Sequence, residues 1–180
     1  MFREVRIPAG VQGRLFLHSM PGRCESLERV WDQVGARGVS AIICLAGADE
    51  IRRESPDYGQ ALAKGAAPCP VITFEISDFG VPKDRTAYWS LAGDVAKRLV
   101  AGNSILIHCG AGIGRTGTLA ECVLLALGHT ADAARGAVSE AGSRAETPGQ
   151  RRLISWCAAQ GAASVTPNNG FQTDNTPPAR

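Results

Sequence analysis

Four short apolar runs, separated by stretches with helical periodicity, dominate the hydrophobic pattern of the chain. The runs predict strands at 14–18, 40–45, 71–76 and 104–108. Helices are predicted around 27–34, over 56–64 with Ser55 as cap and Pro56 as first residue, from Asp84 to about Val100, over 118–127, after Thr130, and from Thr147 on. This alternation indicates an α/β domain with a central, mostly parallel sheet flanked by helices on both faces.

The pattern fades near the end of the sequence. Residues 161–180 lack periodicity and are rich in Pro, Asn, Thr and Ala, so we expect a disordered C-terminal tail there. The preceding residues, 1–160, are expected to form one domain. Of the 180 residues, 44% are hydrophobic, which is enough for one buried core.

Charge and cysteine usage exclude several classes of protein. The formal net charge is only +2, so no nucleic acid or anionic membrane is expected as a partner, and we expect a monomer. No apolar run is long enough for a signal peptide or a membrane span, which predicts a cytoplasmic location. The six cysteines form no CxxC pair, so neither a metal site nor a disulfide framework is predicted.

The strongest chemical pattern follows the strand at 104–108. The residues are His108-Cys109-Gly110-Ala111-Gly112-Ile113-Gly114-Arg115-Thr116-Gly117. Their glycines also satisfy the dinucleotide motif GxGxxG, but that motif needs an acidic residue after a following strand, and 130–160 is predicted to be helical. A nucleoside triphosphate loop would carry glycine in place of Cys109 and lysine in place of Arg115.

A phosphate-binding loop with a nucleophile uses every residue of this pattern. Five residues separate Cys109 from Arg115, so the intervening N–H groups can converge on one phosphate while Arg115 offers a planar fork. The intervening residues are Gly110, Ala111, Gly112, Ile113 and Gly114. The helix N-terminus and Arg115 are expected to favour the reactive thiolate form of Cys109. A structural turn with an incidental cysteine is the alternative.

Two neighbours of the nucleophile have expected supporting roles. Thr116 is expected to donate its hydroxyl to the Cys109 thiolate and later to the departing sulfur. His108 is expected to hold the loop backbone rather than transfer protons.

Residues 108–117 match in full the signature HCxxGxxRTG, and the chain therefore resembles the protein tyrosine phosphatase superfamily. Its size and layout are similar to the dual-specificity branch. The Met20-Pro21-Gly22 turn, an acidic pair soon after Cys44, and an Asp-x-Gly-x-Pro loop at Asp78 resemble the cyclin-dependent kinase inhibitor 3 group, also called the kinase-associated phosphatase group. The resemblance implies a phosphorylated protein as substrate, hydrolysed at phosphotyrosine through a cysteinyl-phosphate intermediate. Phosphoserine and phosphothreonine are further candidates, and no cofactor is expected.

Expulsion of the leaving group requires a general acid on a mobile loop. Asp78 follows the strand at 71–76 and matches the general-acid aspartate of the resembling family, although such a residue also commonly bonds its own turn. Asp84 is the competitor, but it fits a helix N-cap better. Gln150 lies in a segment that resembles a water-positioning element, while Thr147 and Gln150 also fit a capping box, and the two roles are compatible.

Cys44 and Cys109 each follow or end a buried strand, so sheet adjacency could bring them to one edge. In some relatives a cysteine matching Cys44 forms a reversible disulfide with the nucleophile, which makes Cys44 a possible redox partner. A small buried apolar side chain is the alternative.

The variable positions of the signature loop bear on the substrate. In the superfamily that the chain resembles, phosphoinositide phosphatases tend to carry lysines inside the signature loop. The variable positions here are Gly110, Ala111 and Ile113, so the resemblance disfavours phosphoinositides and, by the same argument, RNA 5′-phosphates as substrates. A catalytically silent phosphate-binding module is the remaining alternative.

Overall fold

The computed structural model describes residues 1–165, which form five strands and seven helices. The strands are β1 (Arg3–Val5), β2 (Arg14–His18), β3 (Val39–Cys44), β4 (Val71–Thr73) and β5 (Ser104–His108). The helices are α1 (Leu27–Ala36), α2 (Ala48–Glu54), α3 (Pro56–Ala63), α4 (Arg85–Val100), α5 (Gly114–Ala126), α6 (Ala131–Glu140) and α7 (Pro148–Val165).

The strands form one mixed sheet in the order β1-β2-β5-β3-β4. Only β1 runs antiparallel to its neighbour within this sheet, so the expected mostly parallel α/β fold is confirmed. The central strand β5 is paired on both sides, and its Ile105, Leu106 and Ile107 are fully buried. Since parallel strands share their carboxyl ends, the loops after β3, β4 and β5 meet at one edge.

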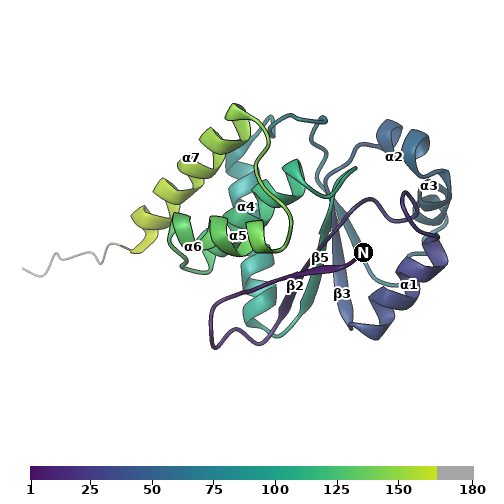
Figure 1. Cartoon of the computed structure of the whole chain (residues 1–180), viewed down its shortest axis with the longest axis horizontal. Coiled ribbons are helices and arrows are strands. Elements are labelled where there is room, and N and C mark those ends of the chain that lie inside the picture. The colour runs from purple at the N-terminus through teal and green to yellow at the C-terminus, as the bar shows by residue number, and fades with distance from the viewer. Residues whose placement is uncertain (166–180) are drawn as a thin grey trace, which may run out of the picture.

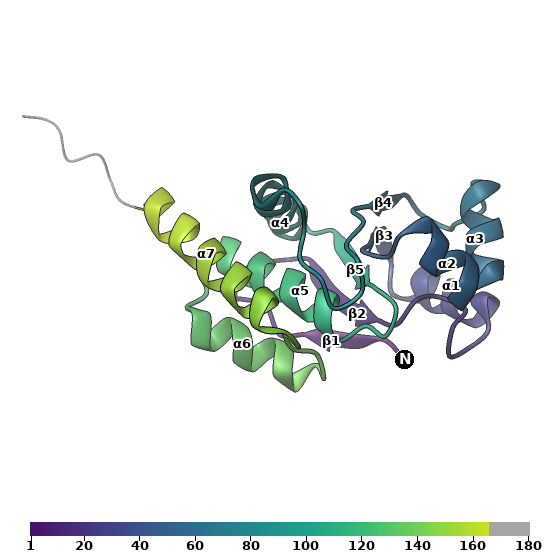
Figure 2. The same ribbon diagram turned by 90° about the horizontal axis from the view of Figure 1, so that it is seen from above.

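Helices cover both faces of the sheet (Figures 1 and 2). Helices α1 to α3 lie on one side, and α4 to α7 pack on the other. Side chains alternate between the two faces with the period of two that strands impose. Ile105 and Ile107 belong to the large core under α4 to α7, whereas Leu106 packs in a smaller core with Val30 and Val34 of α1.

Two predicted element boundaries were wrong in ways that affect the site. The strand predicted at 71–76 ends at Thr73, because its partner β3 ends at Cys44. The chain then continues as a loop held by hydrogen bonds from Phe74 N to Cys44 O (2.9 Å) and from Ile76 N to Leu45 O (3.1 Å). Helix α5 begins at Gly114, four residues before the predicted start, so Arg115 and Thr116 lie in its first turn.

Of the helix caps predicted at Asp84 and Ser55, the first is confirmed and the second is wrong. Asp84 caps α4 as predicted, since its Oδ1 accepts from Thr86 N at 2.8 Å and Ala87 N at 3.0 Å. Ser55 precedes α3, but its hydroxyl donates to Pro21 O at 2.7 Å and does not cap the helix. Ser55 therefore ties α3 to the Met20-Pro21-Gly22 turn.

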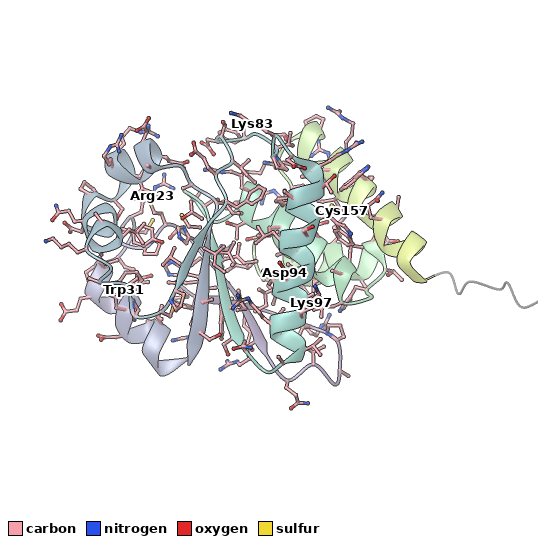
Figure 3. The ribbon with its side chains drawn as sticks, turned by 180° about the vertical axis from the view of Figure 1, so that it is seen from behind. Arg23, Trp31, Lys83, Asp94, Lys97 and Cys157 are labelled. Carbon is pink, nitrogen blue, oxygen red and sulfur yellow. The ribbon has the colours of Figure 1, made fainter. Side chains whose placement is uncertain are left out.

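Helices α4 and α7 both lie on the same side of the sheet (Figures 1 and 2). Asp94 and Lys97, labelled on α4 in Figure 3, form an ion pair at 3.3 Å. Helix α7 runs to Val165, so the expected domain boundary after residue 160 falls inside this helix. The rest of the expected tail, 166–180, lies outside the described residues. Among the helices of residues 1–165, none combines the length and hydropathy needed to cross a bilayer.

Candidate active site

The phosphate loop joins the end of β5 to the start of α5. Cys109 lies at its beginning and is buried, and its Sγ accepts a hydrogen bond from Gly112 N at 3.3 Å. Gly112 has a φ of +75°, and a β-carbon there would lie 2.7 Å from Ser19 N. Only glycine can adopt this backbone and leave room for the neighbouring chain. The loop therefore curls around the sulfur as the sequence predicts.

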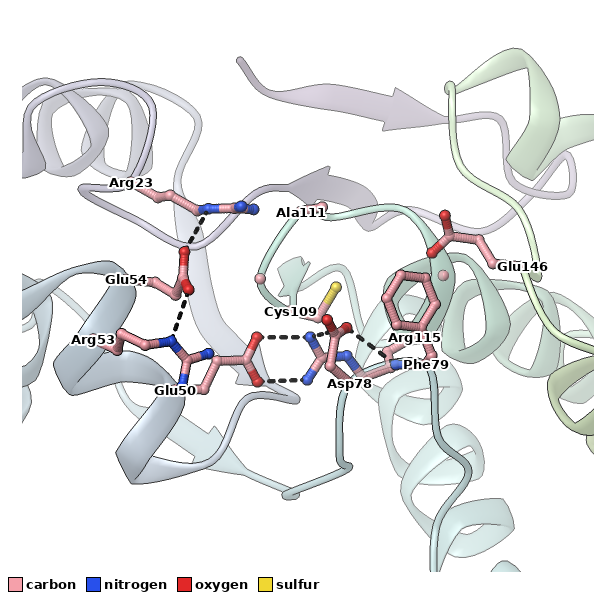
Figure 4. Close-up of a pocket in the computed structure, with 12 residues that line it drawn as sticks. Arg23, Glu50, Arg53, Glu54, Asp78, Phe79, Cys109, Ala111, Arg115 and Glu146 are labelled. Atoms are coloured by element: carbon pink, nitrogen blue, oxygen red, sulfur yellow. Dashed lines mark hydrogen bonds and ion pairs between the residues drawn. The ribbon is translucent and has the colours of Figure 1, made fainter.

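The guanidinium of Arg115 has a hydrogen bond for each of its four terminal N–H groups, and those to Glu50 and Asp78 are drawn in Figure 4. Glu50 binds it in a bidentate manner, with Nη1 and Nη2 each 2.7 Å from a carboxylate oxygen. Nη1 also donates to Ile76 O at 2.8 Å, and Nη2 donates to Asp78 Oδ1 at 2.9 Å. Burial lowers the pKa of Arg115, but the bonds to Glu50 and the nearby negative groups outweigh this and raise it overall.

A cavity of about 200 Å³ opens above the loop. Its lining residues are Arg23, Glu50, Arg53, Glu54, Asp78, Phe79, Cys109, Gly110, Ala111, Gly114, Arg115 and Glu146. Cys109, Arg115 and Asp78, predicted as nucleophile, clamp and acid, thus line the same cavity. Its walls differ in character, with the guanidinium groups of Arg23 and Arg53 on the α2 side and the ring of Phe79 with Glu146 on the other (Figure 4).

The loop that carries Asp78 is anchored at several points. Asp78 Oδ1 accepts from Phe79 N at 3.1 Å, which is the local turn bond weighed as an alternative, in addition to its contact with Arg115. Phe79 has a φ of 55°, which costs energy for a residue with a side chain, and the residue is 61% exposed. The side chain of Asp78 is itself 65% exposed, so it is free to meet a bound substrate.

Gln150 has the capping role predicted for it and one further contact. Its Oε1 accepts from Thr147 N at 3.3 Å, and its backbone N donates to Thr147 Oγ1 at 3.2 Å, which are the two bonds of a capping box at the start of α7. Its Nε2 donates to Gly80 O at 3.2 Å. Gln150 therefore connects the first turn of α7 to the Asp78 loop, while its role in positioning water stays a prediction.

Thr116 does not make the hydrogen bond predicted for it. Its Oγ1 is buried and has no hydrogen-bond partner within residues 1–165, so the expected donation to Cys109 Sγ is absent. Gly112 N donates to the sulfur instead. The early start of α5 places Thr116 in a helical turn, whereas the hydrophobic pattern predicted a helix only from Thr118 on.

His108 holds the loop backbone as predicted. Its Nδ1 lies 3.1 Å from Cys109 O, and because a carbonyl only accepts, this nitrogen carries the proton. Nε2 then accepts from the hydroxyl of Tyr58 at 2.9 Å. Complete burial lowers the pKa of His108 to about 4, so the ring is neutral at pH 7.

This neutral histidine predicts a loss of stability in acid. The pKa of His108 falls from 6.5 in the unfolded chain to about 4 in the fold, so the unfolded state binds the proton first as the pH drops. Between pH 7 and pH 4 the group should remove about 3 kcal/mol from the free energy of unfolding. Urea denaturation across this range should show a shallower loss for His108→Asn than for the wild type. An equally steep loss in both proteins would contradict this assignment.

Cys44 lies beside His108 in the sheet, with Leu45 N donating to His108 O at 2.9 Å. Its side chain packs among Met20, Ile51 and Tyr58, whereas Cys109 belongs to the core on the other face. Burial raises the pKa of Cys44 to about 11, which keeps it a thiol at neutral pH. The arrangement favours a packed apolar side chain, and the redox role stays a prediction.

Some residues of the cavity were not identified from the sequence. Glu50 orients Arg115, and its signal was the acidic pair after Cys44, which contributed to the resemblance but received no role. Arg23 and Arg53 were not singled out at all. They lie at some distance in the sequence from the signature, and nothing in their local pattern points to a cavity.

Comparison with known proteins agrees with this geometry. Residues 11–165 match the family model of the Swiss Army Knife protein DSP-PTPase phosphatase domain. The chain belongs to this family. The protein is therefore a cysteine-based phosphatase, as the signature at residues 108–117 predicted. None of the curated protein sequences matches the chain.

Solved structures share the fold of this phosphatase. Kinase-associated phosphatase, solved with its catalytic cysteine replaced by serine, is 18% identical, with a TM-score of 0.74 over 91% of this chain and 96% of that one. PTPMT1 in complex with PI(5)P is 16% identical, with a TM-score of 0.67 over 84% and 94%. Human DUSP28 is 19% identical, with a TM-score of 0.64 over 89% and 99%. At sequence identities this low, the similarity to these structures shows a shared fold alone.

Proposed function

We propose that the protein hydrolyses phosphotyrosine in protein substrates through a cysteinyl-phosphate intermediate. The supporting observation is that Asp78, from the loop after β4, lines one cavity of about 200 Å³ together with Cys109 and Arg115 of the phosphate loop. Phosphoserine and phosphothreonine are additional substrates to test. A phosphopeptide set containing all three residues, assayed for released phosphate, tests the proposal; hydrolysis of none of them would overturn it.

In the first step the phosphate sits against the N–H groups of the loop. The Cys109 thiolate attacks phosphorus, an S–P bond forms, and the P–O bond to the leaving group breaks. Asp78 gives its proton to the leaving oxygen, so that a neutral tyrosine hydroxyl departs. Arg115 stabilises the negative charge on the transferred group by donating to a phosphate oxygen the Nη2 N–H that Asp78 occupies in the free protein.

In the second step a water molecule replaces the departed tyrosine. Asp78, now a carboxylate, takes a proton from this water as the water attacks phosphorus. The S–P bond breaks, inorganic phosphate forms, and the Cys109 thiolate is regenerated. Gln150 supports the step by holding Gly80 and thereby the loop on which Asp78 stands.

Substrate entry requires a change of partners at Arg115. All four terminal N–H groups are engaged, and three of their bonds go to Glu50 and to the backbone of Ile76. The bond to Asp78 involves the more exposed partner, with 65% of the Asp78 side chain accessible against 15% for Glu50. A bound phosphate would therefore displace Asp78 from Nη2 and release the carboxyl to face the leaving group.

The cavity wall formed by Arg23 and Arg53 favours substrates with a second anionic group. Glu54 forms ion pairs with both side chains, at 3.3 Å from Arg23 Nε and 3.0 Å from Arg53 Nε, so one carboxylate faces two positive charges. The neighbouring Arg52 pairs with Asp49 and does not line the cavity. An acidic residue beside the phosphotyrosine would meet this surplus of positive charge.

We expect the double variant R23Q/R53Q to raise KM for an acidic phosphotyrosine peptide about fivefold, which is the usual worth of two solvent-screened ion pairs. KM for a peptide with neutral flanks should stay within about twofold of wild type, and R52Q serves as matched control. KM for a phosphoinositide with a second phosphate is measured in parallel. The comparison shows whether a lipid or a peptide supplies the second anionic group. Equal effects on acidic and neutral peptides would contradict the prediction.

A further inference from the structure

Arg3 connects the first strand of the sheet to the phosphate loop. It stands on β1 and is half-buried, and its guanidinium contacts two segments far away in the sequence. Nη2 donates to Gly112 O in the phosphate loop. Nη1 donates to the loop after α6, at 2.7 Å from Gly142 O, 3.2 Å from Ala141 O and 3.1 Å from Ser143 Oγ.

The carbonyl of Gly112 accepts a second hydrogen bond, which comes from the loop after α6. Ser143 is buried, and its Oγ donates to Gly112 O at 2.8 Å. The next loop carbonyl, Ile113 O, accepts from Arg144 N at 3.4 Å. Arg3 and the segment after α6 thus support the outer side of the phosphate loop, opposite the cavity.

This support matters because of how such a loop is built. When successive N–H groups turn inward to an anion, carbonyl groups must turn outward, and an outward carbonyl in the protein interior needs donors of its own. Gly112 has both features, since its N–H faces Cys109 Sγ and its carbonyl faces Arg3 and Ser143. Its φ of +75° gives the backbone this orientation, which few residue types could maintain.

We propose that Arg3 is a positioning residue of the active site, which, with Ser143, fixes the Gly112 carbonyl so that the loop N–H groups face sulfur and phosphate. The inference rests on the proposed function only for its effect on turnover; the effect on phosphate binding does not depend on it. Arginine suits the position because one planar fork reaches carbonyls of two segments at once, which a lysine ammonium could not match.

The test compares Arg3→Ala, Arg3→Lys and Ser143→Ala with wild type. Three quantities are measured: the dissociation constant of inorganic phosphate by calorimetry, the rate of Cys109 alkylation by iodoacetamide at pH 7, and kcat/KM for p-nitrophenyl phosphate. Arg3→Ala should weaken phosphate binding by roughly tenfold, the usual worth of hydrogen bonds from a charged donor, and should slow alkylation. Arg3→Lys should lie between this variant and wild type.

Arg6→Ala is the matched control. Arg6 follows Arg3 on the N-terminal segment and pairs with Glu140 at 3.2 Å on the surface, away from the phosphate loop. Ser143→Ala should change the same quantities in the same direction by a smaller factor. In Arg3→Ala/Ser143→Ala the combined loss should be smaller than the product of the single losses, because both side chains act on one carbonyl.

A purely structural role would give a different result. If Arg3→Ala and Ser143→Ala lowered the melting temperature but left the dissociation constant of phosphate and the alkylation rate within about twofold of wild type, the proposal would be overturned. Should Arg3→Ala fail to fold, Ser143→Ala and Arg3→Lys decide the question by the same measurements. A wild-type protein without turnover would refute the proposed function, yet phosphate binding and alkylation would still test Arg3.

Discussion

Replacement of Cys109 by serine is expected to lower turnover of p-nitrophenyl phosphate by at least about 10⁴-fold, the scale seen when a covalent nucleophile is removed. A serine hydroxyl is a far weaker nucleophile than a thiolate, and Asp78 acts as the acid of this step, so it cannot at the same time take the serine proton. Arg115 keeps its partners in this variant, and so do the loop N–H groups. Phosphate and phosphopeptide binding should therefore persist, which equilibrium dialysis or calorimetry would measure.

Cys24→Ser provides the matched control for this experiment. Cys24 is exposed and does not line the cavity, so the same chemical change there should leave activity intact. Turnover by Cys109→Ser near the wild-type rate would refute the cysteine mechanism. Phosphopeptide binding without any wild-type turnover would instead indicate a silent binding module.

The fold could be predicted where burial makes the pattern strong. The runs at 14–18 and 104–108 are strands with the predicted boundaries, because both lie inside the sheet and are covered on both faces. Strand β1 was missed because it has only three residues, of which Arg3 and Glu4 are charged. Its place in the sheet depends on pairing with β2, and such a long-range contact leaves no period in so short a segment.

The site could be predicted where spacing along the chain determines geometry. Cys109 and Arg115 lie on one loop, so their separation sufficed, and Asp78 could be proposed because parallel strands end at a common edge. Glu50 could not be chosen over its acidic neighbour, since only the orientation of α2 decides which carboxylate faces Arg115. The same holds for Arg3, which meets Gly112 from 109 positions away.

Replacement of Asp78 by alanine is expected to lower kcat by about 10²-fold or more, the usual contribution of a positioned general acid. The structure adds an opposite effect on binding. Asp78 occupies one Nη2 hydrogen of Arg115, which phosphate must otherwise take from it. Without the carboxylate this donor is available and one negative charge is gone from the cavity, so inorganic phosphate should bind more tightly to the variant than to wild type.

Two variants separate this mechanism from its competitors. Asp84→Ala removes the cap of α4 and should lower the melting temperature with little effect on kcat, because Asp84 Oδ1 is committed to Thr86 and Ala87. Asp78→Asn keeps a side chain of similar size near Arg115 but cannot act as an acid, so it should share the loss of kcat. A large fall in kcat for Asp84→Ala and not for Asp78→Ala would reassign the acid. Weaker phosphate binding in Asp78→Ala would contradict this prediction. It would show that the Asp78 carboxylate holds Arg115 in place for phosphate and does not compete with phosphate for the Nη2 N–H.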